Sequence, residues 1–166
     1  TSAKEISEIL QPYLLRFLFT RTDYNRSIEF NPIATVTILD LFDEYDRCWQ
    51  DYNSGNNEIY SRVFELSQVT DLPKKMKDLY IPRFRDVVNY IQNTSLHDLP
   101  AKFEQSKGKK LTFEEIKILR EREDYAALWI GKYAPEEFKF QLNEKSDVSI
   151  SEEQKIFLRE VIKLLD

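Results

Sequence analysis

Residues that break helices are rare in this sequence, and this feature constrains the fold most. The 166 residues include three glycines and six prolines, and no segment alternates for long between apolar and polar residues. β-Sandwiches use many glycines at their turns and strands with a period of two, so the pattern argues against them. Glu, Lys, Leu and Ile favour long helices instead. The sequence therefore predicts a mainly α protein, built as an irregular helical bundle.

Apolar residues recur at helical spacing between turn and capping signals. Residues 3–10 and 12–20 are expected to form two short helices or one kinked helix. Further helices are expected at about residues 34–53, 57–70, 82–91 and 98–105, and two more begin after Thr112 and Ser151. Pro12 suits a first helical position, and Gly55 suits a left-handed cap. Thr112 and Ser151 each begin a capping box, because a Glu or Gln follows three residues later. The pattern thus predicts seven or eight helices.

The single cysteine and the single histidine exclude several kinds of site. Cys48 alone can form neither a disulfide within the chain nor a Cys-based zinc site, and it favours a reducing compartment. His97 alone excludes His-rich metal sites. No run of about 18 apolar residues occurs, and the N-terminus lacks a signal-peptide pattern. We therefore expect a cytoplasmic protein without a membrane partner or a bound metal.

Few segments suggest catalysis. The sequence has no Gly-rich phosphate loop, and Ser106–Lys110 is interpreted as a solvated basic turn. His97 has no nucleophile nearby in sequence. The carboxylates of Asp43–Asp46 are expected to spread around a helix axis rather than converge on a metal. Cys48 is expected to be buried and inert.

Charge is unevenly distributed along the chain. The net charge is −5, but residues 73–85 carry five basic side chains against one acidic, and residues 40–60 carry six acidic against one basic. An acidic protein needs such segregation to bind nucleic acid, because only charges within a Debye length act together. Arginine forks grip phosphates and aromatic faces stack unpaired bases, so an RNA surface is one interpretation. Ordinary solvated helix faces are the alternative.

Four ordered motifs carry a resemblance to a known family. They are Pro12–Thr22 followed by Asn25-Arg26, then Leu41–Arg47, Pro82–Arg85, and Trp129 with Tyr133–Phe140. Together they resemble the region that follows the KMSKS loop in class I lysyl-tRNA synthetases. Tyr13 departs from the family pattern, which usually has Glu at this position, and Asp23-Tyr24 stands where Lys-Pro is common.

The resemblance implies a fold and a function. Neither a KMSKS nor a His-Ile-Gly-His-type motif occurs, so the chain is similar to the part C-terminal to the catalytic domain. Residues 1–32 would then form a connecting segment, and residues 33–166 an α-helix cage that binds the anticodon, expected to be truncated at its C-terminus. The implied partners are tRNA-Lys and the catalytic domain, which uses ATP to lysylate the tRNA. The chain alone is expected to hold no cofactor and to be inactive.

The expected tRNA contacts follow from this resemblance and from residue type. The cage candidates are Arg83, Arg85, Lys117, Arg120, Arg122 and Lys132, and the candidates that bridge to the tRNA body are Arg16, Arg21 and Arg26. Trp129 and Tyr133 are candidates for base stacking, with core packing as the alternative for Trp129. Asp43, Glu44 and Arg47 are expected to form an internal ion-pair network. The competing interpretation is a helical protein-interaction module without RNA binding.

Overall fold

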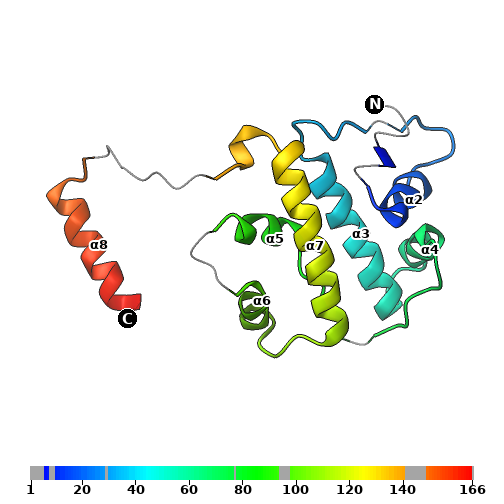
Figure 1. Cartoon of the computed structure of the whole chain (residues 1–166). Coiled ribbons are helices and arrows are strands. Elements are labelled where there is room, and N and C mark those ends of the chain that lie inside the picture. Colours follow the sequence, from blue (N-terminus) through cyan, green and yellow to red (C-terminus); the bar gives the residue numbers. More distant parts are fainter. Residues whose placement is uncertain are drawn as a thin grey trace.

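A computed structural model of the chain describes residues 6–7, 10–28, 30–76, 78–93, 98–140 and 149–165. These residues form helices and no strand, which confirms the mainly α prediction (Figure 1). The helices are α2 (Pro12–Thr20), α3 (Thr37–Ser54), α4 (Glu58–Ser67), α5 (Phe84–Ile91), α6 (Leu99–Lys107), α7 (Phe113–Lys132), the 3-10 turn η1 (Glu136–Phe138) and α8 (Glu152–Leu165). Across the described ranges, no helix is both long and apolar enough to cross a membrane.

Local signals place most helix ends. Pro12 is the first residue of α2, and Gly55 ends α3 with a φ of 72°. The capping box of Thr112 makes both of its hydrogen bonds, and Ser151 exchanges the same two bonds with Gln154. The expected helix at 3–10 lies mostly outside the described residues.

Two expected starts were a few residues early. α3 begins at Thr37 rather than near 34, because Ala34 has a φ of 51° that a right-handed helix cannot contain. α5 begins at Phe84, because Arg83 has an extended conformation.

Helices α3 and α7 form the centre of the bundle. In Figure 1, α2 and α4 lie on one side of this pair and α5 and α6 on the other. The Phe42 ring on α3 stacks on Phe84 of α5, with ring centroids 3.9 Å apart, and the Tyr45 ring contacts Phe17 of α2 and Phe64 of α4. Burying each such ring stabilises the fold by roughly 2–3 kcal/mol. α8 lies apart from the bundle and leaves its apolar residues Ile156, Phe157 and Ile162 exposed (Figure 1).

The glycines at 55 and 131 give a matched pair of predictions for stability. We expect Gly55→Ala to lower the free energy of unfolding by about 1 kcal/mol, because an alanine is strained at this left-handed φ. Gly131→Ala should raise it by about 0.5 kcal/mol, because a Cβ there meets open space within α7. Urea unfolding of both variants measures the two effects. Changes of the same sign would contradict the backbone assignment.

Candidate nucleic-acid interface

Two of the three arginines expected to bridge toward the tRNA body have acidic partners. Arg21, at the end of α2, forms an ion pair with Glu44 on α3. Arg26 lies 3.5 Å from Asp23 in an exposed pair within the turn after α2. Arg16 is exposed and forms no ion pair with any residue in the described ranges. Of these three side chains, Arg16 is therefore the one whose guanidinium has no acidic partner.

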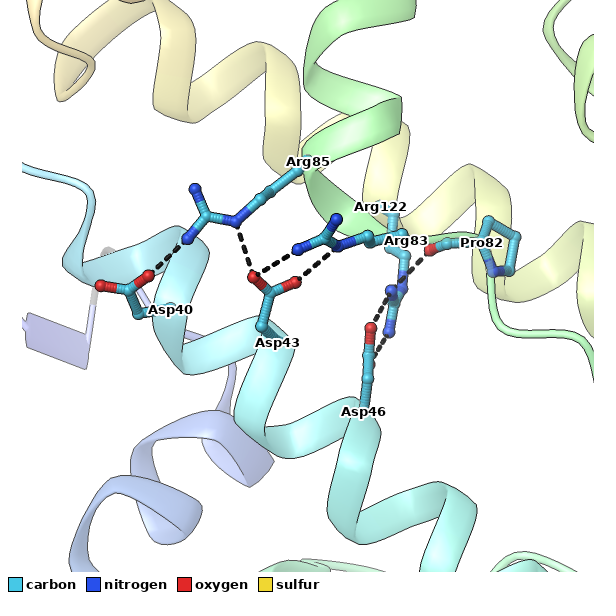
Figure 2. A network of polar contacts seen from close by, with 7 residues as sticks. All are labelled: Asp40, Asp43, Asp46, Pro82, Arg83, Arg85 and Arg122. Carbon is cyan, nitrogen blue, oxygen red and sulfur yellow. Dashed lines mark hydrogen bonds and ion pairs between the residues drawn. The ribbon is translucent and has the colours of Figure 1, made fainter.

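Arg83 and Arg85 belong to a network of ion pairs between α3 and the start of α5, which Figure 2 shows. The guanidinium of Arg83 binds both oxygens of Asp43, at 3.0 and 3.1 Å, and Arg85 binds Asp43 at 2.6 Å and also Asp40. Burial by itself would raise the pKa of Asp43, but the hydrogen bonds from the two arginines outweigh it and hold the pKa below its usual value. Both arginine forks are thus occupied by carboxylates.

The carboxylates of Asp43–Asp46 do not converge on one point. Asp43 and Asp46 lie with Asp40 on one face of α3, because the three are spaced by three residues, whereas Glu44 pairs with Arg21 of α2. Each of these carboxylates is bound by an arginine, and no group of residues in the described ranges could hold a metal ion. The expected internal network is confirmed for Asp43 and Glu44. Arg47 forms no ion pair with a described residue.

Arg122 is a buried structural residue, which corrects its assignment as a tRNA contact. Its side chain is 5% exposed, and its guanidinium binds both carboxylate oxygens of Asp46 and the carbonyl oxygen of Pro82 (Figure 2). Burial alone would lower the pKa of Arg122, but the charge and hydrogen bonds of Asp46 more than offset this and raise it. A side chain enclosed in this way cannot reach a phosphate.

The remaining candidates lie along α7 and are not brought together. Trp129 is 1% exposed and packs edge-on against Phe138, so its ring offers no face to a base and its assignment to stacking is corrected. Lys132 is exposed and Tyr133 half-buried at the C-terminal end of the helix. Lys117 lies fifteen residues earlier, which corresponds to about 22 Å along the axis.

Arg120 lies on another side of α7. It forms an i,i+3 pair with Glu123, and both residues line a cavity of about 430 Å³ together with Tyr90 and Asp98. The polar lining of this cavity mixes both signs of charge.

Two further expectations concern single residues. Cys48 is buried, and burial raises the pKa of its thiol to about 11, which confirms that it is unreactive. His97 lies outside the described residues.

A second cavity, of about 880 Å³, lies between four helices and one loop, and the term "the cavity" refers to it from this point on. Its walls come from Tyr13 on α2, Tyr45 and Trp49 on α3, Phe64 on α4, residues 68–76 and Leu79, and one face of α7. The rings of Trp49 and Phe64 stack with centroids 5.6 Å apart and an interplanar angle of 19°. Phe64 is fully buried behind this contact, whereas Trp49 is half-buried and is the ring of the pair that the cavity can reach.

One stripe of α7 lines the cavity, because its residues recur every four positions. Phe113, Lys117 and Glu121 form this stripe, with Glu114, Ile118 and Arg122 beside them. Exposure falls along it, from 80% at Phe113 to 4% at Arg122. The stripe therefore runs from a solvent-exposed aromatic ring and ammonium group to a carboxylate and a buried guanidinium at the inner end.

The loop opposite α7 is attached to α3 by its backbone. The Tyr52 hydroxyl donates to the carbonyl of Pro73 at 3.0 Å, and the amide of Met76 donates to the Asn53 side chain at 2.9 Å. Lys75 places its ammonium 4.7 Å from the centroid of the Tyr52 ring. These contacts hold the lysine rim of the cavity, which we define as Lys74, Lys75 and Lys117. All three lysines are exposed, and the nearby acidic groups on the same rim are Asp71 and Glu114.

Tyr13 and Glu121 meet within the cavity, where the Tyr13 hydroxyl donates to Oε1 of Glu121. Burial raises the pKa of Tyr13, and the neighbouring Glu121 charge raises it further, so the hydroxyl stays protonated and keeps its role as a donor. The pair connects the segment before residue 33 to α7. It also fixes the direction in which the Glu121 carboxylate points.

Sequence reasoning missed most of this site. Lys74 and Lys75 belong to the basic stretch at 73–85 but are not among the predicted tRNA contacts, and neither are Phe113 and Glu121. The spacing of Phe113, Lys117 and Glu121 was a usable signal, because it places an aromatic, a basic and an acidic residue on one helical face. The stacked pair of Trp49 and Phe64 had no local signal, since the two rings come from different helices.

Comparison with curated proteins finds similarity along almost the whole chain. The lysine–tRNA ligase of Picrophilus torridus is 26% identical over 99% of this chain and 32% of its own length. The enzyme of Pyrococcus horikoshii is 30% identical over 98% of this chain and 32% of its own length. The enzyme of Thermoplasma volcanium is 31% identical over 89% of this chain and 28% of its own length. No family model matches the chain. The chain spans about a third of the length of these relatives. The similarity confirms the resemblance indicated by the motifs, and this share is consistent with the expected C-terminal region.

Proposed function

We propose a function on the premise that this chain is related, along nearly its whole length, to one part of the lysine–tRNA ligases. In this proposal the chain binds tRNA-Lys and recognises its anticodon in an α-helix cage, and residues 1–32 connect the cage to a catalytic domain. That domain would use ATP to attach lysine to the tRNA in the cytoplasm. The chain itself carries out no step of this reaction and holds no cofactor.

The cavity is the observation that carries the proposal. Proteins that read an RNA sequence mainly bind unstacked, single-stranded bases. Such a site needs aromatic side chains on which the bases stack, and donors or acceptors that form hydrogen bonds with the base edges. The cavity is lined by the half-buried ring of Trp49 and the exposed ring of Phe113, and the lysine rim lies where a backbone entering it would pass. The forks of Arg83 and Arg85 are occupied, so the rim lysines replace them as the proposed phosphate contacts.

Titration with tRNA-Lys at several salt concentrations tests this function. Binding should weaken steeply as salt rises, because neutralised phosphates release their counterions. Replacing Lys74, Lys75 and Lys117 together by alanine should flatten the slope of log affinity against log salt by about two units, at roughly 0.7 for each phosphate contact on a single strand.

A charge-matched control separates the rim from general attraction. Replacing Lys109, Lys155 and Lys163, which are exposed and outside the cavity lining, changes the net charge equally and should leave most of the slope intact. Equal effects of the two triple variants would contradict the cavity as the binding site. Absence of salt-dependent tRNA binding would contradict the function itself.

One observation favours the alternative of a protein-interaction module. α8 exposes Ile156, Phe157, Leu158 and Ile162 away from the bundle, and large exposed apolar side chains of this kind are typical of a docking surface. The same titration separates the alternatives, since an interaction module predicts no tRNA binding that depends on the lysine rim.

A further inference from the structure

Resting on the proposed function, we propose that Glu121 is a specificity-determining residue that accepts a hydrogen bond from the ring N–H of one unstacked uracil. The cavity would then select uracil over cytosine at one anticodon position. The proposal depends on the contacts around Glu121.

Glu121 has the acceptor capacity that this role requires. One carboxylate oxygen accepts the hydroxyl of Tyr13, and the other has no hydrogen-bond partner among the residues that the structure describes. An ionised carboxylate offers about four lone-pair positions in total, so accepting one further N–H is within its capacity. The hydrogen bonds of the neighbouring Arg122 that the structure describes go to Asp46 and Pro82, and none of them goes to Glu121.

Tyr13 makes this acceptor directional. Its ring is held against Tyr45, with centroids 5.1 Å apart, and its hydroxyl donates to Glu121. A carboxylate held in this way presents its second oxygen in a defined direction, which a flexible surface glutamate does not do. Preorganisation of this kind converts a hydrogen bond into discrimination, because the group does not rotate to suit a different base edge.

The base chemistry then decides what the carboxylate accepts. Uracil presents a ring N–H between two carbonyl oxygens, whereas cytosine presents a ring nitrogen lone pair at the same place. A carboxylate attracts the N–H and repels the lone pair, so it distinguishes the two pyrimidines by the sign of one interaction. Lys117 lies one turn before Glu121 on the same stripe, where its ammonium can donate to a flanking carbonyl of uracil. Phe113 and Trp49 supply apolar faces for the ring.

The test measures dissociation constants for tRNA-Lys transcripts that carry uridine, or cytidine in its place, at each anticodon uridine in turn. The unmodified chain should prefer uridine by about tenfold or more at one position, which corresponds to one good edge contact. Glu121→Gln should reduce this ratio to within about threefold of one, because an amide can rotate to offer either a donor or an acceptor. Glu123→Gln is the matched control, since it makes the same change on the same helix outside the cavity lining, and it should keep the ratio.

The outcomes separate the two proposals. If the chain binds tRNA-Lys with the expected salt dependence but shows no uridine preference, or if Glu121→Gln keeps the preference, the inference about Glu121 is overturned and the tRNA-binding function stands. If the chain does not bind tRNA-Lys at all, both are overturned. Circular dichroism checks that Glu121→Gln is folded, and where it is not, Tyr13→Phe serves instead, since it removes only the hydroxyl that orients Glu121 and should also lower the ratio.

Discussion

Replacing Arg122 with methionine should lower the free energy of unfolding by about 3–5 kcal/mol, the largest effect we expect from a single substitution. The reason is the carboxylate that it leaves behind. Asp46 is 8% exposed, and Arg122 supplies both of its ion-pair hydrogen bonds, so methionine would bury an uncompensated charge. The carbonyl of Pro82 also loses its donor. Guanidinium chloride unfolding, followed by circular dichroism, measures the change.

Two further variants make this prediction specific. Arg83→Met removes an arginine that is 57% exposed from the same network, and it should cost less than about 1 kcal/mol because solvent screens the pair. Adding Asp46→Leu to Arg122→Met should recover much of the loss, because it removes the unpaired charge. If the double variant is no more stable than Arg122→Met alone, the loss comes from packing rather than from the buried charge.

Glu115→Gln should lower the free energy of unfolding at pH 7 by about 3 kcal/mol. The Glu115 carboxylate is 1% exposed and connects three segments. It accepts the amide of Tyr80 at 2.9 Å, the amide of Thr112 at 2.7 Å and the ammonium of Lys107, whose side chain is also buried. A neutral amide would leave the Lys107 charge unpaired and place its own N–H group against a donor.

The same substitution has a pH signature with a defined sign. Burial alone would raise the pKa of Glu115, but the hydrogen bonds from Lys107, Thr112 and Tyr80 outweigh it, so the pKa lies below its ordinary 4.5 in the folded chain. The unfolded chain then binds the proton more readily. The stabilisation is therefore fully present above the ordinary pKa and is lost as the pH falls through the folded value.

We therefore expect the free energies of unfolding of the unmodified chain and of Glu115→Gln to converge as the pH is lowered from about 7 to about 3. Glu114→Gln is the matched control, because its side chain is the exposed neighbour, and its curve should stay parallel to that of the unmodified chain. If the two chains differ in free energy of unfolding by the same amount at every pH, the charge of Glu115 does not cause the loss of stability.

The positions of most helices could be predicted from the amino-acid sequence, because helix signals are local. Pro12, Gly55 and the capping box of Thr112 each act within one turn of chain, and all three are found where the pattern placed them. The resemblance to lysyl-tRNA synthetases was also readable, since ordered motifs survive without knowledge of the packing. The basic stretch at 73–85 was located as well, but not the partners of its arginines.

Which charged and aromatic side chains remain free to bind a ligand depends on how distant segments pack, so it could not be predicted from the sequence. Arg83 and Arg85 lie about forty residues from the carboxylates that occupy them, and no local pattern links residues so far apart. The apolar residues of α7 surround much of the helix, so the sequence could not show that Trp129 and Arg122 face the core while Lys117 faces the cavity. Burial depends on which helix face meets a neighbour, and that is settled when distant segments pack. For the same reason the cavity, whose walls come from four helices and a loop, could not be foreseen from any one of them.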